Sequence, residues 1–79
     1  MILVLAENLA SATMCAMCNG LKPGQFEYVS HHGQLSDLAE GRHIWANFDY
    51  KDHPEFLKFS YEIKRRKLKL VKPYSVKFS

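Results

Sequence analysis

The apolar run from Ile2 to Ala6 is the feature that most limits how this chain can fold. Its letters, ILVLA, are continuously apolar and do not alternate with polar residues. Such a run is typical of a strand covered on both faces in a parallel sheet. It lacks basic flanking residues, and it is far shorter than the roughly 20 residues that a membrane span requires. We therefore predict a central strand in a cytoplasmic protein that has no membrane partner.

The rest of the chain alternates between segments typical of helices and segments typical of strands. With the first strand, the order is β-α-β-(turn)-β-α-β, which is typical of a single small α/β domain with a mostly parallel sheet of three or four strands. Residues 1–73 are expected to form this domain, and residues 74–79 a C-terminal tail. Several strand orders fit this pattern. The segments after the first strand are a helix between Asn8 and Gly20, a strand over 25–30, a helical turn over 33–41, a strand over 43–48, a helix from Asp52 to about Lys67, and a strand over 67–73.

Both longer helices have start signals in the sequence. Asn8 is a good cap for the first. Asp52, followed by Pro54 and then by Glu55 three residues after the cap, predicts a capping box for the second. The helical period also predicts which residues face the core. In the first helix these are Leu9, Ala12, Thr13, Ala16 and Met17; in the second they are Phe56, Phe59, Ser60 and Ile63, widened by Leu57 and Tyr61, with Lys58, Glu62, Arg65 and Arg66 on the opposite arc.

Charge is distributed unevenly along the chain. Residues 1–40 carry one Lys and four acidic side chains, whereas residues 41–79 carry ten Lys or Arg and four acidic side chains, so a net charge of +3 divides into −3 and +6. The basic end is the natural place to look for an acidic partner. Two interpretations stay open for the basic segment 64–72: a solvated helix end and edge strand, or a surface that contacts nucleic-acid phosphates. Its cations are Lys64, Arg65, Arg66, Lys67, Lys69 and Lys72.

Two cysteines are too few for the disulfide framework of a small secreted fold, which also favours a reducing compartment. Cys15 and Cys18 have the C-x-x-C spacing, but they lie inside the first predicted helix and not at its start, where the helix dipole would lower a thiol pKa. Only His31 and His32, from another loop, could complete a metal site, and nothing in the sequence fixes their convergence with the thiols. We expect inert thiols, no metal and no cofactor.

Polar side chains follow three of the predicted strands. The carboxyl ends of parallel strands meet at one edge, where open α/β sheets place their ligands. A small-ligand or catalytic site is therefore one hypothesis, although caps and turns also explain these residue types. The candidate rim residues are Glu7, Asn8, His31, His32 and Asp49, with Asp52 nearby.

The segment after the first strand argues against a conventional nucleotide site. Mononucleotide-binding α/β proteins place a glycine-rich loop there, which exposes backbone N–H groups to phosphate. The corresponding letters, LAENLASAT, contain no glycine.

Residues 2–50, ILVLAENLASATMCAMCNGLKPGQFEYVSHHGQLSDLAEGRHIWANFDY, resemble small bacteriophage-encoded α/β proteins. The shared features are the short first strand, the Ala-rich helix ending in G-L-x-P-G, and the strand near YVS. The letters LSDLAEGRHIWANFD are also similar in layout to the region before the acidic strand of P-loop ATPases of the helicase and terminase kind. Asn47 and Asp49 stand where that family has an adjacent Asp-Glu pair. The resemblance implies an α/β core without ATPase chemistry.

Three functions follow from these patterns as expectations. The first is a non-enzymatic, phage-encoded binding module that docks on a host or phage protein, because catalytic motifs are missing and aromatic residues exceed what a small core needs. The second is nucleic-acid binding through segment 64–72. The third is ligand binding or catalysis at the rim. Homo-oligomers fit as well, since a domain of 79 residues buries too little surface to be very stable alone.

Overall fold

Four parallel strands form the centre of the protein in the computed structural model, which describes residues 1–73. The strands are β1 (Ile2–Leu5), β2 (Phe26–Tyr28), β3 (His43–Ala46) and β4 (Lys69–Val71), in the spatial order β2-β1-β3-β4. All three neighbouring pairs are parallel. The predicted small α/β domain with a mostly parallel sheet is therefore confirmed, and β1 is one of the two inner strands. Strand β4 lies at an edge, as its alternating lysines predict.

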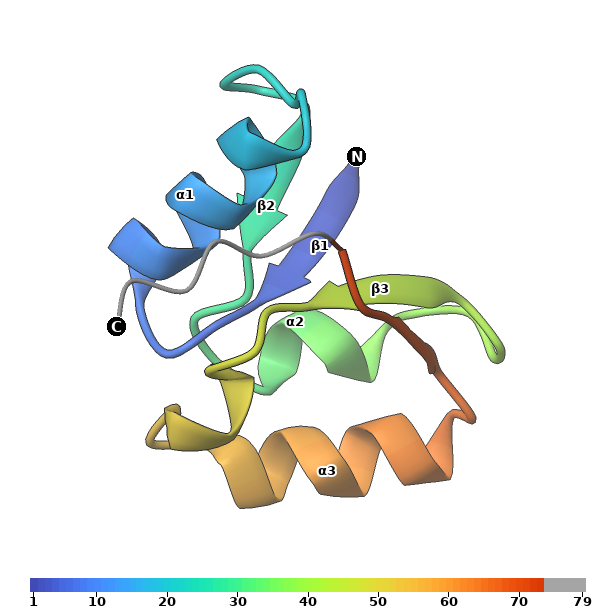
Figure 1. Cartoon of the computed structure of the whole chain (residues 1–79). Helices are drawn as coiled ribbons and strands as arrows, with labels where there is room; N and C mark the ends of the chain where they lie inside the picture. Colours follow the sequence, from blue (N-terminus) through green and yellow to red (C-terminus); the bar gives the residue numbers. More distant parts are fainter. Residues whose placement is uncertain (74–79) are drawn as a thin grey trace.

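The helices divide between the two faces of the sheet. Helix α1 (Leu9–Cys18) covers one face, and α2 (Gly33–Ser36) and α3 (Phe56–Arg65) lie together on the other, as Figure 1 shows. A short 3₁₀ helix, η1 (Tyr50–Asp52), precedes α3. The division follows from the strand order, because the β1-to-β2 crossover and the later crossovers run in opposite directions and share one handedness. No helix within residues 1–73 is long and apolar enough to cross a membrane.

The side chains of β1 explain why its sequence is continuously apolar. Leu3 and Leu5 enter the larger core cluster, on the side of α2 and α3, whereas Val4 and Ala6 enter the cluster beneath α1. All four are at least 95% buried. Successive side chains in a strand point to opposite faces, so a strand that has a helix layer on both sides needs apolar residues at every position.

Helix α1 begins as predicted but faces the sheet differently. The Asn8 side-chain Oδ1 accepts a hydrogen bond from the Ser11 backbone N–H at 2.9 Å, which confirms the cap. The predicted core face was partly wrong, since Leu9 and Met17 are 60% and 57% exposed. The buried residues are Ala12, Cys15 and Ala16. Small side chains let the helix approach the sheet closely, and this turns the larger ones outward.

The predicted start of α3 was wrong. Asp52 belongs to η1, and α3 begins four residues later at Phe56, without any side-chain cap from its N-cap residue. His53 has an extended backbone, and its ring Nδ1 accepts the backbone N–H of Glu55 at 2.9 Å. Because Glu55 turns toward His32 instead of back toward Asp52, the capping box cannot form.

The face that α3 buries also differs from the prediction. Phe59 is fully buried and Ile63 packs against the larger core cluster, as expected. Leu57 and Tyr61, however, are 80% and 64% exposed, whereas Glu62 is only 6% exposed. Helical positions three apart lie on neighbouring parts of one face, so centring the helix on Phe59 brings Glu62 inward and turns Leu57 and Tyr61 out.

Candidate functional site

Asp49 is the centre of the polar contacts at the carboxyl ends of β1 and β3. It is 7% exposed. Its Oδ1 accepts hydrogen bonds from the backbone N–H of Glu7 at 3.3 Å and from the side-chain Nδ2 of Asn47 at 2.9 Å. The carboxylate thus joins the segments that leave two neighbouring strands. The chain continues from β1 to one face of the sheet and from β3 to the other, which is the point where open α/β sheets place ligands.

The charge of Asp49 affects two neighbouring titratable groups. Burial, and then the Asp49 carboxylate, raise the pKa of the Cys15 thiol above 9.0, with a smaller contribution from Cys18. Burial and Asp49 also raise the pKa of the Tyr28 hydroxyl above 10.0. Both groups therefore stay protonated near neutral pH. A buried, protonated thiol is a poor nucleophile, although the second thiol of the pair, Cys18, is exposed.

The two neighbouring histidines make separate contacts and do not join the Asp49 cluster. The ring Nδ1 of His31 accepts the backbone N–H of Gly33 at 3.1 Å and closes the turn before α2. His32 Nδ1 lies 2.7 Å from the Glu55 carboxylate, which connects the start of α2 to the start of α3. Within residues 1–73, no hydrogen bond or ion pair links either histidine to Asp49. The predicted rim residues therefore fall into two groups.

The other rim residues have structural roles. Asn8 caps α1, and Asp52 lies in η1. Glu7 enters the Asp49 cluster through its backbone, while its side chain is exposed. Across the described part of the chain, no group of three or more His, Cys, Asp or Glu side chains could hold a metal ion.

The contact between Glu55 and His32 predicts a pH-dependent effect. The hydrogen bonds from His32 lower the pKa of the Glu55 carboxyl below 4.5. A lowered native-state pKa means that this contact stabilises the fold above pH 4.5, and that the stabilisation is lost as the pH falls through the lower value. We expect His32→Ala to raise the pKa of Glu55, measured by NMR titration of its side-chain carboxyl.

The matched control for this titration is His31→Ala, because the His31 ring contacts Gly33 and not Glu55. That variant should leave the Glu55 titration unchanged. An equal shift in both variants would show that the cause is general electrostatics and not the contact at 2.7 Å.

A pocket of about 450 Å³ lies at the carboxyl ends of β3 and β4. Several of its lining residues are neighbours of Asp49 in the sequence, but none of the predicted rim residues lines it. The predicted rim contained only residues with a carboxylate, imidazole or amide side chain. This pocket is instead lined largely by aromatic and lysine side chains that come after β3 and β4 in the sequence. Its lining residues are Ala46, Asn47, Phe48, Tyr50, Lys51, Lys72 and Pro73.

Three of the six cations of segment 64–72 lie near acidic side chains. The Nη1 of Arg66 donates to the Leu38 carbonyl at 2.9 Å, and its Nε lies 3.4 Å from the Glu62 carboxylate. Arg65 lies 3.7 Å from the same carboxylate. Lys67 lies 3.5 Å from Glu40, so an acid from the first half of the chain partly neutralises the basic half.

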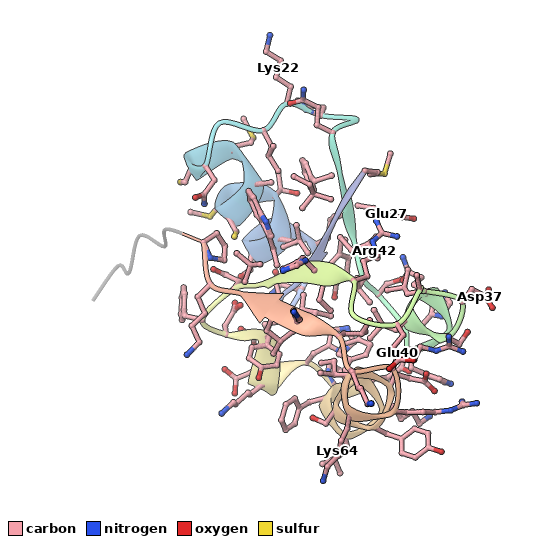
Figure 2. The ribbon with its side chains drawn as sticks, turned by 90° about the vertical axis from the view of Figure 1, so that its right-hand side faces the viewer. Lys22, Glu27, Asp37, Glu40, Arg42 and Lys64 are labelled. Carbon is pink, nitrogen blue, oxygen red and sulfur yellow. The ribbon has the colours of Figure 1, made fainter. Side chains whose placement is uncertain are left out.

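The other three cations of the segment have no ion-pair partner among residues 1–73, but they are dispersed. Lys64 extends from α3 at the end of the molecule opposite Lys22, as Figure 2 shows. Lys69 begins β4 and Lys72 follows its end, so they lie at opposite ends of the strand. The segment could contact an extended phosphate backbone only at separated points.

Exposed apolar side chains gather on two helices. On α3, the exposed Leu57 and Tyr61 border a second pocket of about 390 Å³, shared with His32, Lys58 and Glu62. On α1, three large side chains are at least half exposed: Leu9, Met14 and Met17. Helix α1 contains no charged residue in its ten positions. We call Leu9, Met14 and Met17 the α1 outer surface.

Comparisons of this chain with protein-family models, with curated proteins and with solved structures found no match.

Proposed function

We propose that this protein is a non-enzymatic binding module that docks on another protein through the α1 outer surface. The observation that supports this proposal is that a ten-residue helix without a charge exposes Leu9, Met14 and Met17. A surface helix normally carries polar residues on the face opposite the core, and a helix that is apolar all round is normally buried. A partner that covers α1 would bury these exposed apolar side chains.

The spacing of the exposed residues suits insertion into a groove. Met14 and Met17 of the α1 outer surface follow the exposed Ala10 at i+4 and i+7, and Leu9 precedes this row by one position. The side chains of Ala12 and Cys15, on the other side of the helix, enter the core cluster beneath α1. Anchors with this spacing are typical of helices that lie in apolar grooves of their partners. Methionine is unbranched and polarizable, so it adapts to irregular apolar surfaces. The partner is therefore a protein with an apolar groove that accepts the outer face of one helix.

A second copy of this chain fits the α1 outer surface less well. A helix of ten residues is about 15 Å long. Two such helices crossing each other touch over a short length, whereas a stable interface buries about 1,200 Å² or more. A groove that fits around the exposed face of α1 covers more of its surface than a crossing helix does. The resemblance to phage-encoded proteins directs the search to the host cytoplasm, with a host or phage protein as the partner.

Nucleic-acid binding through segment 64–72 is the alternative proposal. Lys64, Lys69 and Lys72 support it, because each is exposed and without an ion-pair partner among the described residues. Their separation makes it the weaker of the two proposals. Three of the other basic side chains already lie near Glu62 or Glu40.

Two charge insertions on α1 test docking directly. We expect Met14→Glu with Met17→Glu to weaken partner binding at least about 30-fold, since central apolar anchors commonly contribute 2 kcal/mol or more each. The control is Leu57→Glu, which places one such charge on the 80% exposed position of α3. Proteins captured from a bacterial host by the wild type and by the control, but not by the double variant, would be purified and titrated by calorimetry.

Far-UV circular dichroism should show that all three proteins are equally folded, because the substituted side chains are exposed. A purified partner that binds the double variant as tightly as the wild type would contradict docking through α1. Loss of binding in Leu57→Glu alone would move the docking surface to α3.

A further inference from the structure

The pocket at the carboxyl ends of β3 and β4 has a positive lining. Lys51, from η1, and Lys72, which follows β4, both border it. No acidic side chain is among its lining residues in the described part of the chain. Two acids are adjacent in sequence to lining residues: Asp49 directs its carboxylate to Glu7 and Asn47, and Asp52 is exposed and does not line the pocket. A lining that holds two lysines and no acidic residue favours an anionic ligand.

Two aromatic rings supply the apolar part of the same pocket. Tyr50 is half-buried, and its ring meets the Phe56 ring edge-on at a centroid distance of 5.7 Å and an interplanar angle of 72°. This contact fixes one wall of the pocket. Phe48, 55% exposed, provides the other aromatic side chain. Exposed aromatic faces stack readily on planar ligands, including all the nucleobases.

Size and position agree with a ligand site. The volume of about 450 Å³ falls within the range of about 300–1,000 Å³ that is usual for small-molecule pockets. The pocket lies outside the carboxyl ends of two parallel strands, the edge where open α/β sheets place ligands. The second pocket, on α3, differs in that Glu62 and Lys58 both line it, so its charge favours neither sign.

We propose that the pocket between η1 and the end of β4 binds a nucleoside monophosphate unit, with the base against Phe48 and Tyr50 and the phosphate between Lys51 and Lys72. This unit combines a planar aromatic group, which matches the two rings, with an anion, which matches the two lysines. Lysine binds phosphate as a point charge, so the glycine-rich backbone loop that is missing after β1 is not needed here. The unit comes from a free nucleotide or from the phosphorylated end of a strand.

The test is an NMR titration of the ¹⁵N-labelled full chain with each of the 5′-monophosphates of adenosine, guanosine, cytidine and uridine. We expect saturable shifts centred on the amides of Phe48, Lys51 and Lys72, with a Kd of about 0.1–1 mM for at least one nucleotide. Adenosine without phosphate should bind about tenfold more weakly than its monophosphate, because it forms no charge-assisted contact.

Charge removal at the pocket is the second part of the test. Lys51→Gln and Lys72→Gln should each weaken binding about 3- to 10-fold. The matched control is Lys22→Gln, because Lys22 extends from the top of the molecule in Figure 2 and does not line the pocket. This variant should bind like the wild type.

Three results would overturn the proposal: no saturable shifts with any of the four nucleotides, shifts centred away from the pocket, or unchanged affinity in both lysine variants. Inorganic phosphate that binds as tightly as the nucleotides would also overturn it, because the rings would then contribute nothing. A short oligonucleotide with a 5′-phosphate distinguishes the two sources. If it binds the same residues more tightly than the free nucleotides, the unit is a strand end; if it binds more weakly, the unit is a free nucleotide.

Discussion

Replacing Phe59 by alanine should lower the free energy of unfolding by about 3–5 kcal/mol, the usual cost of truncating a buried aromatic side chain. Phe59 is fully buried in the larger core cluster. Its ring also lies 4.5 Å from the His53 ring, measured between centroids, so truncation would remove a contact at the turn into α3 as well. Small domains have only about 5–15 kcal/mol of total stability, and the loss is a large share of it.

Urea unfolding followed by circular dichroism measures this loss. The matched control is Leu57→Ala on the same helix, where the side chain is 80% exposed and the expected change is within about 0.5 kcal/mol. Phe59→Leu keeps most of the volume and should lose about 1–2 kcal/mol, which provides a measurable variant if Phe59→Ala does not fold. Similar losses in Leu57→Ala and Phe59→Leu would mean that α3 packs through a different face.

Replacing Asp49 by alanine should cost about 1–3 kcal/mol, because two hydrogen-bond donors would lose a buried acceptor. These donors are the backbone N–H of Glu7 and the side-chain Nδ2 of Asn47. The contact joins residues 42 positions apart in sequence, so its loss should also loosen the edge between β1 and β3. Chemical unfolding gives the energy, and amide hydrogen exchange at Glu7 gives the local loosening.

Asp49→Asn is the matched control, because it keeps a side-chain oxygen as acceptor and removes only the charge. Its stability should lie closer to the wild type than that of Asp49→Ala. Both substitutions should lower the pKa values of Cys15 and Tyr28 toward 9.0 and 10.0, since the Asp49 charge is one of the causes that raise them. NMR titration of the labelled side chains would show this. Unchanged pKa values in both variants would leave burial as the cause at Tyr28, and burial with the smaller contribution of Cys18 as the cause at Cys15.

The sequence by itself predicted the elements whose signals are local. The continuous apolar letters of residues 2–6 predicted an inner strand, and Asn8 predicted the start of α1 through a hydrogen bond to a residue three positions away. The alternation of helices and strands predicted a parallel sheet. Such signals succeed because strand period, helix caps and turn residues act within a few positions of the chain.

Only the tertiary structure decided the strand order, the start of α3 and the faces that the helices bury. Glu55 turns away from Asp52 because His32, 23 positions earlier, lies beside it. Arg66 leaves the predicted basic surface because it reaches the Leu38 carbonyl, 28 positions away. These contacts depend on which segments lie side by side on one face of the sheet.

The candidate sites divide in the same way. Sequence patterns identified the polar residues that follow the strands. They did not predict that Asp49 and the two histidines make separate sets of contacts. They also did not predict that Phe48, Lys51 and Lys72 line one pocket, or that α1 exposes Met14. The physical reason is that a pocket or an exposed face is made by packing between segments distant in sequence, whereas the sequence specifies only the periodicity within each segment.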